Sequence, residues 1–153
     1  KRTGFPCITF RLFTPYGPGI QEGRLVYNLI DRTLKGQSLQ MSKATISRDF
    51  VYVEDIPHLL FEALQRAKEK RGEVYNLGSG TSTTLKELTE TVFAALGTRI
   101  EIAWGTLPVL GYDSELWQAD MAKTFSAFAW RPRISLRDGI ARTIEWMRAA
   151  QRT

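Results

Sequence analysis

The sequence is poor in the residues that build disulfides, metal sites and membrane spans. It holds one cysteine, Cys7, and one histidine, His58, among 153 residues. A single cysteine excludes an internal disulfide and fits a reducing compartment, so a cytoplasmic location is expected. One histidine and one cysteine cannot build a zinc site. A Ser–His–acid triad would depend on His58, and the sequence shows no strand-to-helix turn that displays a serine, which argues against nucleophilic hydrolysis. The longest apolar runs fall well short of the roughly 18 residues that cross a membrane.

The first residues also lack the marks of a processed leader. Lys1 and Arg2 precede no apolar segment and no small-residue cleavage site, which excludes a signal peptide in this stretch. There is no initiator methionine, which suggests a chain cut from something longer. Cys7 lies in an apolar stretch and is expected to be a small buried core residue. His58 is expected on or near a helix surface.

What the chain has is the composition of a globular domain with an excess of positive charge. Hydrophobic residues make up 43% and charged residues 24%, with a net charge of +5. That charge favours anionic partners, either nucleic acid or a phosphorylated small molecule. The basic residues are scattered, however, and the one dense cluster, at residues 68–71, is typical of a solvated helix end. The distribution therefore disfavours nucleic-acid binding.

Hydrophobic periodicity predicts strands that alternate with helices. Strands are predicted at residues 7–13, 38–41, 49–53, 73–77 and 99–103. Helices are predicted at residues 24–35, at 84–97 behind a Thr84–Glu87 capping box, at 121–128, and from Ser135 to the end. A further helix is predicted after Asp55, which can serve as its N-cap, with Leu59, Leu60, Ala63 and Leu64 on one face. Residues 14–19 are predicted to be a turn and 104–120 an irregular segment. This alternation indicates an α/β fold with mostly parallel pairing.

The motif Gly78-Ser79-Gly80 follows a predicted strand and precedes a predicted helix, as a dinucleotide fingerprint does. The third glycine of that fingerprint is replaced by Thr83, and the acidic residue about 20 positions on would be Glu101, in the middle of a strand. A tight loop before a capped helix is the better interpretation.

Three other stretches carry candidate binding residues. Residues 11–19 are a strand end followed by a Pro-Gly loop, which is either a ligand-binding loop, since α/β sheets place ligands at the carboxyl ends of their strands, or an ordinary tight turn. In residues 47–55, Arg48 opens a hydrophobic strand, so either Asp49 or Asp55 pairs with it or its guanidinium is left to bind a phosphate. The segment 105–120 offers Asp113 and Trp117 to a pocket, although Trp117 has the alternative of a core position.

These stretches resemble the extended short-chain dehydrogenase/reductases that act on nucleotide sugars. RLFTPYGPG is similar to the family's R-x-F-N-x-Y-G-P-G, and SRDFVYVEDI to its R-D-F-x-x-V-x-D segment. EVYNLGSGTSTTLKEL is similar to Y-N-x-G-x-G-x-x-x-S/T-x-x-E-L, and FAWRPRISLRDGIARTIEWMR to L-G-W-x-P-x-x-x-L-x-x-G-L-x-x-T-I-x-W. The four motifs occur in the family's order and cover nearly the whole chain.

The resemblance implies a contact of Phe13 with the nicotinamide end of the cofactor, and substrate contacts at eight further positions. Those positions are Thr14, Leu25, Gln40, Met41, Arg48, Leu110, Asp113 and Trp117. Arg48 matches the arginine that binds the nucleotide diphosphate. Thr14 stands where the family usually has asparagine, Leu110 where it usually has a second diphosphate-binding arginine, and Trp117 where it usually has tyrosine.

The resemblance also implies the architecture. Residues 1–153 would be the C-terminal substrate-binding portion, made of the last strands of a Rossmann-like parallel sheet and a small mixed α/β domain. NAD or NADP would be bound mainly by an N-terminal half, which also holds the family's Tyr-x-x-x-Lys pair. This segment would then contain no catalytic residue and turn nothing over alone, while the full-length protein would be a homodimer acting on a nucleotide-diphosphate sugar.

Two other interpretations stay open at this point. The first is a non-catalytic nucleotide-sugar-binding or assembly module with a decayed site, for which Thr14 and Leu110 argue. The second is a basic nucleic-acid-binding domain.

Overall fold

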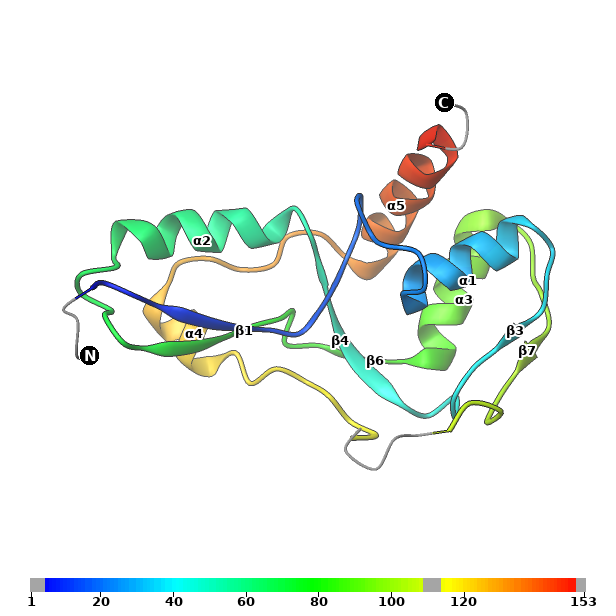
Figure 1. Ribbon diagram of the computed structural model, residues 1–153, viewed down its shortest axis with the longest axis horizontal. Helices are drawn as coiled ribbons and strands as arrows, with labels where there is room; N and C mark the ends of the chain where they lie inside the picture. Colours follow the sequence, from blue (N-terminus) through cyan, green and yellow to red (C-terminus); the bar gives the residue numbers. More distant parts are fainter. Residues whose placement is uncertain (1–4, 109–113, 151–153) are drawn as a thin grey trace.

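Strands and helices alternate along the described part of the chain, residues 5–108 and 114–150 of the computed structural model (Figure 1). The strands are β1 (Thr9–Leu12), β2 (Thr14–Tyr16), β3 (Leu39–Gln40), β4 (Ser47–Tyr52), β5 (Val74–Leu77), β6 (Ser82–Thr84) and β7 (Ile102–Ala103). The helices are α1 (Leu25–Leu34), α2 (Asp55–Gln65), α3 (Leu85–Leu96), α4 (Ala122–Ala127) and α5 (Leu136–Ala150). Strand β1 pairs with β5, β2 with β4 and β3 with β7, all in parallel, and β4 pairs antiparallel with β6. The expected α/β fold with mostly parallel pairing is confirmed.

Strand β4 lies between the two halves of the molecule and is buried on both faces (Figure 1). Successive side chains of a strand point to opposite faces. Phe50 and Tyr52 therefore enter one core and Val51 the other. The same alternation sends Arg48 to the side of Phe50 and Asp49 to the side of Val51, which separates these two charged neighbours.

Each half of the molecule has its own core. Around α1, α3 and α5 the buried members are Tyr16, Val26, Leu29, Ile30, Phe50, Tyr52, Leu88, Val92, Phe93, Ile140, Ile144 and Met147. Around β1, β5, α2 and α4 they are Val51, Leu59, Ala63, Tyr75, Leu77, Ala119, Met121, Phe128 and Trp130. The two cores divide the described chain into two packed halves, with β4 contributing side chains to both.

The turn predicted at residues 14–19 is wrong at its start. Thr14, Pro15 and Tyr16 form β2, which pairs in parallel with residues 50–52 of β4. The predicted strand 7–13 instead ends at Leu12, where the chain leaves β5 and turns to β4. Proline is tolerated here because β2 has a single strand neighbour among the described residues, so the missing N–H breaks no ladder.

Three further sequence predictions are corrected. Asp55 does not cap α2: its buried carboxylate accepts hydrogen bonds from the backbone amides of Arg133 and Ile134, both at 3.1 Å. Cys7 is exposed and not in the core, because β1 begins two residues later. The predicted strand at residues 99–103 is reduced to Ile102–Ala103, while His58 is exposed as expected.

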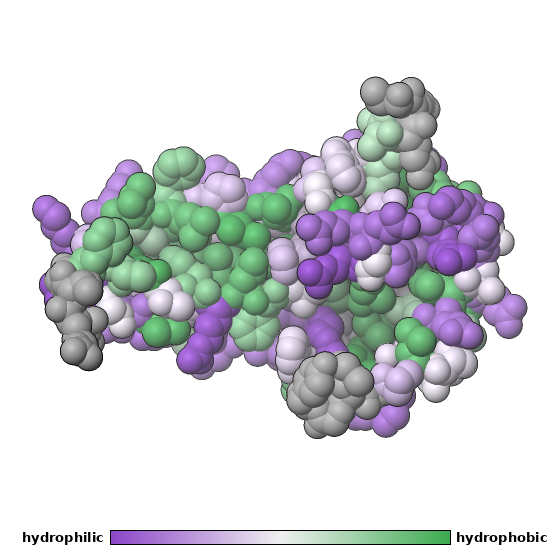
Figure 2. All heavy atoms as spheres, viewed as in Figure 1, coloured by the Kyte–Doolittle hydropathy of each residue, from purple (hydrophilic) through white to green (hydrophobic). Residues whose placement is uncertain are grey.

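Helix α2 presents more apolar surface than the described chain covers. Leu59 and Ala63 are buried, but Leu60, Phe61 and Leu64 are 46%, 68% and 71% exposed. The prediction that Leu60 and Leu64 share the buried face is therefore wrong. Figure 2 shows apolar side chains gathered over the half that contains α2 and β1. Exposed apolar surface of this kind marks an interaction site.

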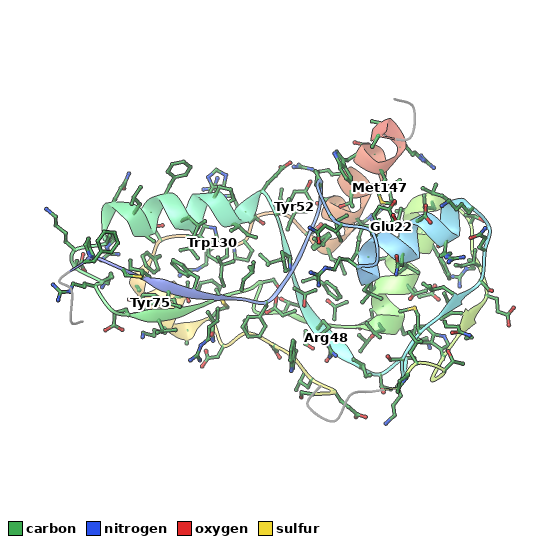
Figure 3. The ribbon with its side chains drawn as sticks, viewed as in Figure 1. Glu22, Arg48, Tyr52, Tyr75, Trp130 and Met147 are labelled. Atoms are coloured by element: carbon green, nitrogen blue, oxygen red, sulfur yellow. The ribbon has the colours of Figure 1, made fainter. Side chains whose placement is uncertain are left out.

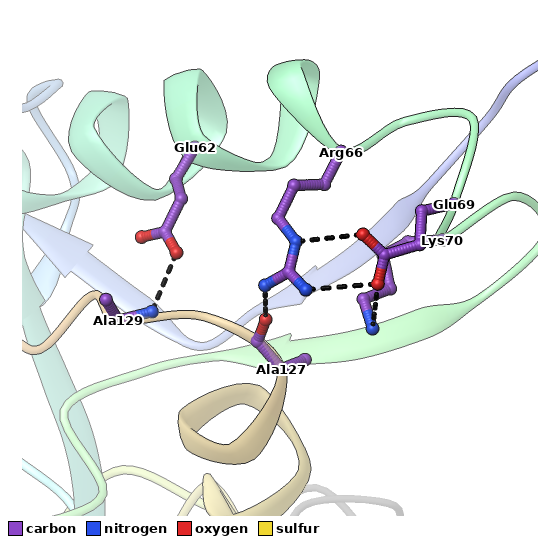
Figure 4. A network of polar contacts seen from close by, with 6 residues as sticks. All are labelled: Glu62, Arg66, Glu69, Lys70, Ala127 and Ala129. Carbon is purple, nitrogen blue, oxygen red and sulfur yellow. Dashed lines mark hydrogen bonds and ion pairs between the residues drawn. The ribbon is translucent and has the colours of Figure 1, made fainter.

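The basic cluster at residues 68–71 follows α2 and is not part of the helix, which ends at Gln65. Arg66 donates to the Ala127 carbonyl and pairs with Glu69 at 3.0 Å, and Glu62 accepts from the Ala129 amide at 2.7 Å (Figure 4). Hydrogen bonds from Arg66, and then from Lys70, lower the pKa of Glu69 to about 2. This network joins the end of α2 to the segment after α4.

The predicted capping box of α3 is confirmed. Thr84 Oγ1 accepts from the Glu87 amide at 3.1 Å, and Glu87 Oε2 accepts from the Thr84 amide at 2.7 Å. We expect Thr84→Ala to cost about 1 kcal/mol of stability, or a fall of roughly 2–4 °C in the midpoint of thermal unfolding. Thermal unfolding followed by circular dichroism checks this, with exposed Thr98→Ala as the unchanged control. Equal midpoints for Thr84→Ala and Thr98→Ala would contradict the role of the cap.

The Tyr16 phenol lies against the start of α5, with Oη 3.4 Å from the Leu136 carbonyl. A Cβ at Gly139 would overlap this hydroxyl, so glycine permits the close approach. Burial, and then the negative charge of ionised Tyr52, Asp55 and Asp138, raises the pKa of Tyr16 well above its usual value.

This raised pKa predicts a loss of stability at alkaline pH. Above pH about 10 the unfolded chain loses the Tyr16 proton while the folded protein keeps it, so the free energy of unfolding falls as pH rises. We expect thermal midpoints above this pH to fall less steeply for Tyr16→Phe than for the wild type. Parallel curves for the two proteins would contradict this assignment.

Candidate functional site

A pocket of about 280 Å³ opens between α1, β3, β4 and α3. Its lining residues are Gly23, Leu25, Asn28, Leu39, Gln40, Met41, Ser42, Ile46, Arg48, Leu85 and Leu107. Most of these side chains are aliphatic, and the charged one is Arg48. A largely apolar pocket with a few polar groups is the usual form of a small-molecule site.

Arg48 extends from β4 to the edge of this pocket (Figure 3). One of its terminal nitrogens donates to the Ser47 carbonyl at 2.8 Å and to the Ser114 carbonyl at 3.0 Å. Its guanidinium carbon lies 5.2 Å from the centre of the Trp117 ring, a cation–π distance. These contacts hold the guanidinium plane in one orientation beside the pocket. Asp49 and Asp55, the two internal partners considered from the sequence, both accept backbone amides.

Backbone hydrogen bonds hold segment 114–118 against β4 beside Arg48. The Ser47 amide donates to the Glu115 carbonyl at 2.8 Å, and the Trp117 amide donates to the Ser47 carbonyl at 3.2 Å. Lys43 pairs with Glu115 at 2.7 Å, and this pairing lowers the pKa of Glu115. Within the irregular stretch expected from the sequence, residues 114–118 thus follow β4 through these contacts, which bring Trp117 to Arg48.

One side of the pocket comes from the turn after β7. Thr106 and Leu107 direct their amides at the Met41 carbonyl, at 3.2 and 3.4 Å, and the Gly105 amide bonds the Ser42 carbonyl at 3.3 Å. Gly105 has a positive φ of 72°, which turns the chain toward β3. The turn brings the Leu107 side chain to the pocket, 59 positions beyond Arg48 in the sequence.

The glycine loop after β5 binds an internal carboxylate. Asp49 is fully buried and accepts from the Ser79 amide at 2.6 Å, the Ser79 hydroxyl at 2.7 Å, the Gly80 amide at 2.9 Å and the Ala119 amide at 3.1 Å. A Cβ at Gly78 would lie 2.8 Å from this carboxylate, so glycine allows the approach. The amides that a dinucleotide phosphate would need are occupied, in agreement with the loop interpretation of Gly78-Ser79-Gly80.

The structure brings half of the predicted substrate positions together. Leu25 from α1, Gln40 and Met41 from the β3 region, and Arg48 from β4 all line the pocket. Trp117 is 45% exposed, so it is not a core aromatic, and it lies over Arg48.

The other predicted positions lie elsewhere. Thr14 is in β2, paired with Phe50, and Phe13 packs against the core of the β1–β5 half; neither is among the described residues that line the pocket. Leu110 and Asp113 lie outside the described residues.

Sequence reasoning missed several lining residues. Asn28 follows Leu25 by three positions, and this spacing places both on one face of α1, so the signal was present. Leu85 and Leu107 gave no such signal, because their approach depends on contacts between distant segments.

A second hollow, of about 580 Å³, lies beside α4. It is lined by Gly80, Leu116, Gln118, Ala119, Asp120, Met121, Ala122 and Phe125. Asp120 is its one charged member among the described residues and would repel a phosphate. The described chain also shows no cluster of metal-ligating side chains and no helix long and apolar enough to cross a membrane.

Comparison with known proteins shows the family to which the sequence is similar. The sequence pattern of the NAD dependent epimerase/dehydratase family matches residues 1–78. The chain is 33% identical over 145 residues to UDP-glucuronic acid decarboxylase 6 of Arabidopsis thaliana, covering 92% of this chain and 40% of that protein.

Solved structures are similar over the same span. The UDP-glucose 4-epimerase of Thermotoga maritima, solved with UDP-glucose, is 27% identical with a TM-score of 0.82, covering 94% of this chain and 46% of that one. MoeE5, solved with UDP-glucuronic acid and NAD, is 28% identical with a TM-score of 0.84, covering 94% and 47%. The chain thus spans less than half the length of these relatives.

Proposed function

Because the chain belongs to the NAD dependent epimerase/dehydratase family, we propose that it is the substrate-binding portion of an NAD(P)-dependent nucleotide-sugar epimerase or dehydratase. The main support for the proposal is that one pocket is lined by Arg48 together with Leu25, Gln40 and Met41. Relatives of known name act on UDP-sugars or were solved with them.

The pocket suits the two chemical parts of a nucleotide diphosphate. The aliphatic side chains of Leu25, Leu39, Met41 and Leu85 would take a planar base out of water. The Arg48 guanidinium, oriented by Trp117, would bind diphosphate oxygens through charge-assisted hydrogen bonds, for which its planar fork is suited. The sugar would then extend beyond Arg48. Thr14, Leu110 and Asp113 remain predicted substrate contacts.

The cofactor does not fit the glycine loop of this chain, because Asp49 already occupies the loop amides. We therefore assign NAD or NADP mainly to a preceding half of a longer protein, with Phe13 as the predicted contact from this portion. The catalytic acid/base pair would lie in that half too, so residues 1–153 alone are expected to be inactive.

The exposed apolar surface of α2 supports a longer protein. Strand β1 pairs with β5 alone among the described strands, which leaves its other edge without a partner strand. Leu60, Phe61 and Leu64 lie exposed on the neighbouring helix. A further strand and helix packed there would extend the parallel sheet and cover these side chains. A homodimer of the full-length protein remains a prediction, which its mass in solution checks.

Calorimetric titration of the full-length gene product with UDP-, dTDP-, CDP- and GDP-sugars tests the proposal. We expect at least one of them to bind, and the free sugar without its nucleotide to bind far more weakly. Failure of all four to bind would overturn the proposal. Binding without NAD-dependent turnover would instead favour the non-catalytic module that Thr14 suggests.

A further inference from the structure

Asn28 holds its side-chain amide in one orientation at the pocket. Its side chain is hydrogen-bonded to the Gly23 amide at 3.2 Å. A backbone N–H must bond an acceptor, so the oxygen Oδ1 faces Gly23 and the nitrogen Nδ2 faces away. The orientation of the Asn28 amide is therefore fixed by the Gly23 N–H, which can only donate.

The Asn28–Gly23 bond spans the beginning of α1. The Asn28 amide donates to the Arg24 carbonyl at 2.8 Å, and Gly23 has a positive φ of 86° that turns the preceding loop toward the helix. Arg24 provides no side-chain cap for α1. In place of a side-chain cap, the Asn28 side chain holds the preceding loop against the start of α1 through its hydrogen bond to Gly23. Both Gly23 and Asn28 line the pocket.

The bond to Gly23 leaves Asn28 with a donor for a ligand. Oδ1 is used, and Nδ2 donates to no other described residue. A bound base would therefore meet two N–H groups from Asn28, in a pocket whose other polar side chains among the described residues are Gln40, Ser42 and Arg48 and whose remaining lining is mostly apolar. An N–H group in such surroundings donates to a carbonyl oxygen and disfavours an amino group, because two facing donors leave both unpaired.

We propose that Asn28 is a specificity-determining residue, which selects a base with a carbonyl oxygen over one with an amino group at the same position. This inference rests on the proposed nucleotide-sugar site. Uracil and cytosine are the matching pair, because they differ at ring position 4 by a carbonyl oxygen against an amino group. The site should therefore prefer a UDP-sugar to the CDP-sugar of the same sugar.

The variant Asn28→Asp distinguishes selection of the base from the structural role of Asn28 in holding the loop at Gly23. A carboxylate still accepts from the Gly23 amide, and a negative charge in the first turn of a helix is favourable, so the variant should fold. The donor toward the ligand, however, becomes an acceptor. Any repulsion of the diphosphate by the new charge affects both ligands equally and cancels in the ratio of their dissociation constants.

The experiment measures that ratio for UDP-glucose and CDP-glucose in the full-length protein. The wild type is expected to favour UDP-glucose at least tenfold, and Asn28→Asp to lower the preference about tenfold or more, as the loss of one hydrogen bond implies. Asn28→Ala loses both the hydrogen bond to Gly23 and the donor toward the ligand, so it should bring the ratio of dissociation constants toward one. If Asn28→Asp does not fold, the ratio for Asn28→Ala tests the role of Asn28.

The experiment distinguishes failure of the role of Asn28 from failure of the proposed function. An unchanged ratio in both variants, with UDP-glucose still bound, overturns the role of Asn28 and leaves the proposed function standing. No binding of either ligand to the wild type overturns the proposed function itself.

Discussion

Replacing Asp49 by alanine is expected to lower the free energy of unfolding by about 3–5 kcal/mol, because the change leaves several buried donors unsatisfied. The carboxylate is fully buried and accepts from three backbone amides, those of Ser79, Gly80 and Ala119, and from the Ser79 hydroxyl. The bonds join β4 to the loop after β5 and to the segment before α4. Their loss should loosen all three segments together.

Urea unfolding of the wild type and of Asp49→Ala gives this difference directly. Ser79→Ala is the matched control: it removes the hydroxyl bond to Asp49 and the exposed bonds between this hydroxyl and the Thr81 backbone, but keeps the three amides paired with Asp49, so we expect a cost of about 1 kcal/mol. Asp49→Asn should fall between the two, because an amide offers one oxygen where the carboxylate offers two. Equal midpoints for Asp49→Ala and Ser79→Ala would show that the buried carboxylate does not hold these segments.

Arg48→Ala is expected to weaken nucleotide-sugar binding roughly 10–100-fold, since a hydrogen bond to a charged group contributes about 1.5–3 kcal/mol. The effect should appear for every diphosphate ligand, whatever its base, because the guanidinium would contact the phosphates. Arg48→Lys should recover part of the affinity, since an ammonium keeps the charge but loses the planar fork. Titration of the three proteins with one UDP-sugar measures the series.

Lys43→Ala is the matched control for Arg48→Ala. Lys43 precedes the same strand and carries the same charge, but it pairs with Glu115 and is not among the pocket residues. Its replacement should change binding little, because both partners of this ion pair are exposed. If both variants lost affinity equally, the effect would come from overall charge, and the pocket would lose its assigned phosphate group.

Much of this protein follows from patterns within a few residues. The helical spacing of Leu25, Leu29 and Ile30 predicted α1, and the Thr84–Glu87 pair predicted the start of α3. The position of Arg48 at the head of a hydrophobic strand indicated that it needs an anionic partner, either Asp49 or Asp55 or a bound phosphate, and the structure places it at the edge of a pocket. The chain's similarity to a known family was also visible in its motifs.

Contacts between distant segments were not visible in such patterns. Local sequence showed neither that β2 would extend through Pro15 nor that α2 would leave Phe61 exposed. It assigned Asp55 to a helix cap, although this carboxylate binds amides 78 and 79 residues away.

Local sequence is therefore enough to specify the order of strands and helices, the α3 cap and the side of β4 from which Arg48 projects, because periodicity and capping depend on neighbours within a few residues. Packing of the whole chain was needed to show that Asp49 holds the glycine loop, that Trp117 lies over Arg48 and that Leu107 closes the pocket. The Asp49 contacts alone join segments 30 to 70 residues apart. Buried polar groups there must find partners wherever the packed chain brings them, and no local pattern specifies those partners.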